Sequence, residues 1–128
     1  HLTVVQKPEI LVQINAAFQK AVGDPNMQVT YGAPTVIYVS CKNEDEEIVK
    51  GCNAGVVMEN MLLEAADLGL GAVYLFGVSQ VLFANEEITK LLQIPEGFRT
   101  VSAIAVGTSA DALQERTLGT DKISTTTL

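Results

Sequence analysis

Few side chains in this sequence could carry out chemistry unaided, and each stands in a poor context. The single histidine, His1, is the first residue, so neither a Ser-His-Asp triad nor a Cys-His pair has a plausible general base. Cys41 ends a predicted strand and Cys52 lies in a predicted helix, and we expect both to be small core residues. One histidine and no Cys-x-x-Cys pair leave too few ligands for a zinc site.

Two other patterns resemble ligand-binding motifs without matching them. The acidic run 44–47 lacks the alternate oxygen ligands and the glycine of an EF-hand, so it is predicted to be a solvated helix start. Gly69-Leu70-Gly71 begins like a dinucleotide fingerprint, but the third glycine position is Tyr74, and the motif follows a helix instead of a strand. Either the protein is not an enzyme, or a cofactor carries the chemistry.

Composition places these residues in one ordinary domain. The chain has 128 residues, of which 48% are hydrophobic and 18% charged, with a formal net charge of -7. Fifteen acids against eight Lys and Arg argue against a nucleic-acid partner, which needs a basic face. The lack of a long apolar run argues against a membrane span, and the lack of a signal peptide favours the cytoplasm.

Strands and helices alternate along the chain, which favours an α/β or α+β class with a largely buried sheet. The strands are expected at 2–5, 34–41, 72–76 and 100–106, and the helices at 8–22, 46–68 and 86–92. Residues 108–128 are expected to form an irregular tail. In the long helix, Gly51, Ala54 and Gly55 form a small-residue face that would let another backbone come close.

Four segments, in this order and at this spacing, resemble the nitroreductase family of FMN-dependent NAD(P)H oxidoreductases. They are residues 31–40 (YGAPTVIYVS), 59–71 (ENMLLEAADLGLG), 94–97 (IPEG) and 104–107 (IAVG). Each segment alone is weakly specific, but together they cover nearly the whole chain. The resemblance implies an α+β fold with a mixed sheet flanked by helices, and a single domain over 1–128.

The resemblance also implies a function. It implies a homodimer with FMN at the subunit interface, reduced by NADH or NADPH and passing two electrons to nitro compounds, quinones or similar small-molecule acceptors. Carried over by position, Tyr74, Leu75, Phe76 and Gly77 would hold the flavin ring, with a backbone N–H near Gly77 bonding its edge. Arg116 would bind the FMN phosphate with its bidentate fork. No acid or base residue is assigned, because solvent can supply the protons.

The chain also departs from the family pattern. His1 to Val4 resembles the strand directly after an Asn-rich stretch in the family's N-terminal part, which also holds an Arg-x-Ser-x-Arg-like segment that grips the FMN phosphate. We therefore expect the chain to be a fragment or processed product that lacks these segments and has an exposed apolar patch. The alternative is a non-catalytic dimeric binding module that has this fold and no longer holds flavin. A third possibility is a relative of the family with a specialised reaction, such as flavin destruction or dehalogenation, and the sequence does not distinguish it from the other two.

Overall fold

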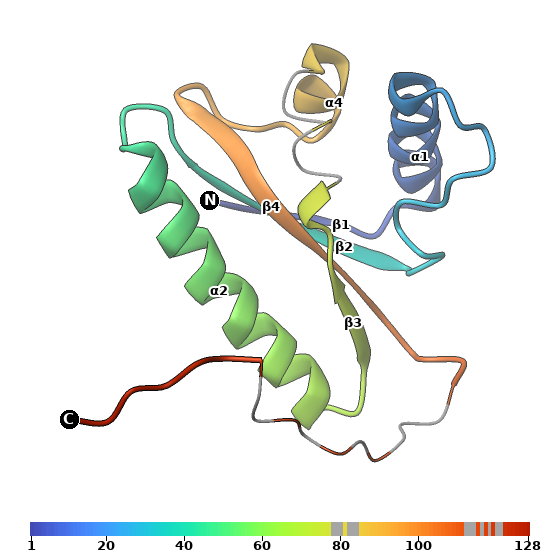
Figure 1. Ribbon diagram of the computed structural model, residues 1–128. Helices are drawn as coiled ribbons and strands as arrows, with labels where there is room; N and C mark the ends of the chain where they lie inside the picture. Colours follow the sequence, from blue (N-terminus) through green and yellow to red (C-terminus); the bar gives the residue numbers. More distant parts are fainter. Residues whose placement is uncertain (78–80, 82–84, 112–114, 116, 118, 120–121) are drawn as a thin grey trace.

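Four strands form one sheet in the order β1-β2-β4-β3 (Figure 1). The strands are β1 (Leu2–Val5), β2 (Thr35–Lys42), β3 (Gly71–Tyr74) and β4 (Phe98–Gly107). This computed structural model describes residues 1–128 except 78–80, 82–84, 112–114, 116, 118 and 120–121. β1 and β3 are the two edges of the described sheet, so β2 and β4 supply most of its buried surface.

The three strand pairings are all antiparallel, so the α+β class is confirmed while the expected mixed sheet is not found among the described strands. β2 and β3 do run in the same direction. β4 lies between them and pairs with both, which separates the two strands that could have made a parallel pair. The sequence predicted the strands, but neither their directions nor the position of β4 between β2 and β3.

Helices cover both faces of the sheet (Figure 1). α1 (Pro8–Val22) and α4 (Glu86–Leu91) pack against one face, where Ile14 and Ile88 meet Tyr38 and Ala103 of the sheet. α2 (Glu47–Asp67) covers the other face, where Ala54 and Met58 meet Val39 and Ile104. Alternate side chains of a strand point to opposite faces, so the continuous apolar run of β2 serves both cores.

Local sequence signals set the ends of the helices. Pro8 begins α1, where its missing N–H costs no hydrogen bond, and Gly23 ends it with a φ of 74°. Asn85 caps α4 by accepting a hydrogen bond from the Ile88 N–H at 3.2 Å. These bounds agree with the expected helices to within one residue.

The prediction that both cysteines are core residues was wrong for Cys52. Cys41 is half-buried at the end of β2, whereas Cys52 is exposed on α2. The apolar residues of α2 extend around the helix beyond the face that touches the sheet, so helical spacing alone did not show which of them are buried. The described residues after Gly107 contain neither helix nor strand.

Candidate functional site

The segment that follows β3 is the candidate site expected from the sequence. β3 ends at Tyr74 instead of reaching residue 76, and Phe76 and Gly77 begin a helical turn. Leu75, between them, is buried in the core with α1 and α4, and its N–H donates to the Ala103 carbonyl at 2.8 Å. The segment therefore leaves the sheet with one side chain anchored and its neighbours free to face outward.

Two aromatic side chains are presented at this point. Phe76 is 58% exposed and Tyr74 is partly exposed, and their rings meet edge to face with centroids 5.9 Å apart. Exposed aromatic rings in contact offer an apolar surface for a planar ligand. The structure thus brings Tyr74 and Phe76 together and separates them from Leu75, whose side chain contributes to folding.

The backbone at this edge is also open to a ligand. Antiparallel pairing directs the peptide groups of alternate residues toward the neighbouring strand, so the Tyr74 peptide faces away from β4 while that of Leu75 faces it. The first N–H groups of a helical turn have no carbonyl partner within the turn. A Cβ added at Gly77 would meet no described atom within 4 Å, so there is space for a ring beside this backbone.

Arg116, the predicted phosphate ligand, lies outside the described residues. Among the described residues there is no group of three or more His, Cys, Asp or Glu side chains that could hold a metal ion. No helix in the described part of the chain is long and apolar enough to cross a membrane.

A polar cluster that the sequence did not indicate lies at the start of α2. Lys50 is buried, and its ammonium donates to the Asn43 carbonyl and to Glu47 Oε1, both at 3.0 Å. The guanidinium of Arg99 binds the second oxygen of Glu47. The hydrogen bond from Lys50, together with Arg99, holds the pKa of Glu47 below its ordinary value. Each charged group of this cluster has a protein partner, so the cluster fastens the turn before α2 to the sheet.

The outer face of α2 carries the small residues expected at an interface, but not all three of them. Ala54 is buried against the sheet, whereas Gly51 and Gly55 are exposed and a Cβ at either would meet nothing within 4 Å. Val56 and Leu63 lie nearby on the exposed side and are 64% and 60% exposed. This side of the helix therefore exposes apolar side chains, with Glu59 and Asn60 between Val56 and Leu63, and no element covers it among the described residues.

Comparisons with known proteins relate this arrangement to one family. The model of the nitroreductase family matches residues 3–108. A curated archaeal relative from Methanothermobacter thermautotrophicus, named as an NADH dehydrogenase/NAD(P)H nitroreductase, is 33% identical over 115 residues. That match covers 87% of this chain and 56% of the relative, so the chain spans a little over half the length of that protein.

Solved structures show the same fold. A nitroreductase with bound FMN from Bacteroides fragilis is similar with a TM-score of 0.80 and 22% identity, over 98% of this chain and 75% of that one. A nitroreductase with bound FMN from Desulfitobacterium hafniense has a TM-score of 0.76 and 20% identity, over 98% and 74% of the two chains. At these identities the likeness establishes the fold and leaves the function to other observations.

Proposed function

The chain belongs to the nitroreductase family, and from this premise we propose that it acts as an FMN-dependent oxidoreductase. The proposed reaction passes two electrons from NADH or NADPH to nitro compounds, quinones or similar small acceptors. The observation that carries the proposal is the family match over residues 3–108, combined with an open, aromatic edge at the position that the family resemblance assigns to the flavin.

The residues present at this edge fit a flavin ring. A fused aromatic ring system with hydrogen-bond acceptors along its rim needs an apolar surface beside backbone donors. Tyr74 and Phe76 supply the apolar surface, and the N–H groups of Tyr74, Phe76 and Gly77 would supply the donors, since the Leu75 N–H already donates to the Ala103 carbonyl. Leu75 holds the segment in place from within the core. Gly77 keeps the approach to the backbone free.

When bound, FMN supplies the two-electron chemistry, and the chain's own part is to bind, orient and exclude water. The exposed ring of Phe76 would cover part of the ligand, and Arg116 would pair with its phosphate. No side chain is assigned to move a proton. This division suits the described segment from Tyr74 to Gly77, in which no side chain is a carboxylate, an imidazole, an amine or a guanidinium.

A homodimer belongs to the same proposal. Val56 and Leu63 on α2 are exposed, and Leu2 and Val4 of the edge strand β1 are also exposed on the α2 side of the sheet. An apolar surface of this kind is the usual sign of a protein interface. A second copy of the chain would cover it.

A flavin titration tests the proposal. We expect the purified chain to keep the visible absorbance of FMN after desalting and to oxidise NADH or NADPH. Phe76→Ala should weaken FMN binding, and Arg116→Ala should weaken it by about 1.5–3 kcal/mol through loss of a charge-assisted phosphate contact. Tyr31→Ala, an exposed aromatic residue in another segment, and Lys122→Ala, a cation of the tail, are the matched controls.

Two outcomes would contradict the proposal. A folded chain that is colourless after incubation with excess FMN and desalting would favour the non-catalytic binding module. Flavin affinity that responds to neither Phe76→Ala nor Arg116→Ala would remove these residues from the site, whatever the affinity of the unmodified chain.

A further inference from the structure

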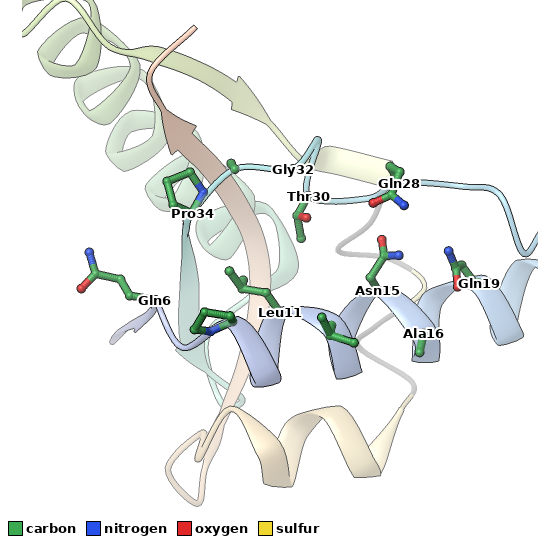
Figure 2. A pocket seen from close by; sticks show the side chains of 12 residues that line it. Gln6, Leu11, Asn15, Ala16, Gln19, Gln28, Thr30, Gly32 and Pro34 are labelled. Carbon is green, nitrogen blue, oxygen red and sulfur yellow. The ribbon is translucent and has the colours of Figure 1, made fainter. Parts of the chain in front are cut away.

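A groove lies between α1 and residues 28–34, the segment that leads into β2 (Figure 2). It is on the face of the sheet opposite α2, since α1 packs on that opposite face. Its volume is about 530 Å³, within the usual range for a small-molecule site. None of the described residues that line it carries a charged side chain.

Two side-chain amides in this groove have fixed orientations. Asn15 Oδ1 accepts a hydrogen bond from the Val29 N–H at 2.9 Å, and Gln19 Nε2 donates to the Met27 carbonyl at 2.9 Å. A backbone N–H can only donate and a carbonyl can only accept, so neither amide can be flipped. The NH2 group of Asn15 (Nδ2) is therefore left as a donor, and the carbonyl oxygen of Gln19 (Oε1) is left as an acceptor. Gln19 lies one helical turn after Asn15 on the same face of α1.

Thr30 adds a third polar group to the groove. The residue as a whole is 6% exposed and lines the groove. Figure 2 shows its side chain between the 28–34 segment and Leu11 of α1. Its hydroxyl is not one of the described buried side-chain atoms that lack a hydrogen-bond partner, which are Tyr38 Oη and Ser102 Oγ, so it is open to water or to a ligand that replaces the water.

We propose that this groove binds an uncharged ligand that carries a carboxamide or lactam group beside an apolar ring. The carboxamide oxygen would accept from Asn15 Nδ2, and its N–H would donate to Gln19 Oε1. Leu11, Val12 and Pro34 line the same groove and give the ring an apolar surface. A carboxylate of the same shape should bind less well, because it has no N–H to donate to Gln19 Oε1. Its negative charge would also be repelled by a protein whose net charge is -7.

The proposal is independent of the flavin site. The groove is formed by α1 and residues 28–34, whereas the flavin is proposed to bind at residues 74–77. Failure of FMN binding would therefore leave this inference intact, and failure of ligand binding in the groove would leave the proposed flavin site intact.

Benzamide and benzoate form a matched pair of probes, because they share the ring and differ in the amide. We expect benzamide to shift the NMR signals of the Val29 N–H and of the Asn15 and Gln19 side-chain NH2 groups in a saturable way, and benzoate not to. Asn15→Asp keeps the acceptor for Val29 but removes the free donor, so it should weaken benzamide binding about tenfold. Gln13→Glu makes the same charge change on α1 outside the lining of this groove and is the control.

Thr30→Val tests the Thr30 hydroxyl separately. If the ligand replaces water at this hydroxyl, benzamide affinity should fall about three- to tenfold in the variant. An unchanged benzamide affinity would remove Thr30 from the site. Equal binding of benzamide and benzoate, or no binding of benzamide to the unmodified chain, would overturn the whole.

Discussion

The buried ammonium of Lys50 shows how single residues hold the turn before α2. The side chain is 3% exposed, and its charge is met by the Asn43 carbonyl and by Glu47. An ammonium buried without such partners would be strongly unfavourable. Glu47 is also bound by Arg99 of β4, so one carboxylate joins α2 to the strand beneath it.

This cluster makes part of the stability depend on pH. The pKa of Glu47 is lower in the folded chain than in the unfolded one, so its contribution is present above the ordinary glutamate pKa and is lost as the pH falls through the lowered value. We expect Glu47→Gln to lower the melting temperature at neutral pH. On acidification from neutral pH to about pH 3, the melting temperature of the variant should fall less than that of the unmodified chain. Thermal unfolding followed by circular dichroism over this range is the measurement.

Glu64→Gln is the control for this experiment. Glu64 is exposed on the same helix, and no ion pair is described for it. An unchanged pH profile in Glu47→Gln, or the same change in Glu64→Gln, would show that Glu47 does not stabilise the fold through Lys50 and Arg99.

The sequence predicted which residues form the candidate flavin edge, but not which of their side chains are buried and which are exposed. Tyr74 to Gly77 were expected to act as one segment, and the structure separates a buried Leu75 from the exposed aromatic pair. Their roles toward flavin remain predictions. Lys50 could not be identified as a buried charge from the sequence, because its partners Asn43 and Glu47 are ordinary surface residues of an acidic turn until the fold places them.

At the scale of elements, α2 has two glycines in its exposed side. Helical glycine is less favourable than alanine by about 1 kcal/mol, and a Cβ at Gly55 meets nothing within 4 Å. Gly55→Ala should therefore raise the stability of the chain by up to about 1 kcal/mol. Chemical denaturation measures this gain, and a loss of stability would mean that the position is crowded.

Gly55→Leu separates folding from association. The larger side chain has space within the single chain, but it would disturb close packing against a second copy. We expect sedimentation velocity to show weaker self-association with little change in unfolding. Ala16→Leu, a comparable addition on the exposed side of α1, should leave association unchanged. Equal association in both variants would exclude this side of α2 from the interface.

The elements were more predictable than their arrangement. Helical spacing, Pro8, Gly23 and Asn85 marked the helices closely, since capping depends on neighbouring residues. Strand order depends on contacts between distant residues, such as the register of Val36 with Ala105 in the β2–β4 pair, and no local pattern encodes it.

At the scale of the whole molecule, exposed apolar side chains gather on the α2 side. Leu2 and Val4 pair with Val39 and Ile37, which pack on the α2 side, so the exposed side chains of β1 lie on the same face of the sheet as α2. The α1 side has α4 beside it and a deeper cluster of buried residues. This asymmetry favours one face for association.

Cys52 offers a direct probe of that face. It is exposed on α2, so in the monomer it should react readily with an alkylating reagent. Cys41 is half-buried and burial raises the pKa of its thiol, so it should react more slowly and serve as the internal reference. We expect Cys52 alkylation, followed by mass spectrometry, to slow as protein concentration rises. A rate that stays constant while the chain associates would place the interface elsewhere.

The place of β4 between β2 and β3 has a consequence for synthesis on the ribosome. When the chain has emerged only as far as residue 97, β1 and β2 can pair. β3 then lacks β4, the strand with which it pairs in the described sheet, and the sheet face that α2 covers is incomplete. The described sheet closes only once β4 is available, because β4 pairs with both β2 and β3. Nascent chains that stall before Gly107 would thus expose apolar faces and strand edges together, which makes them substrates for chaperones.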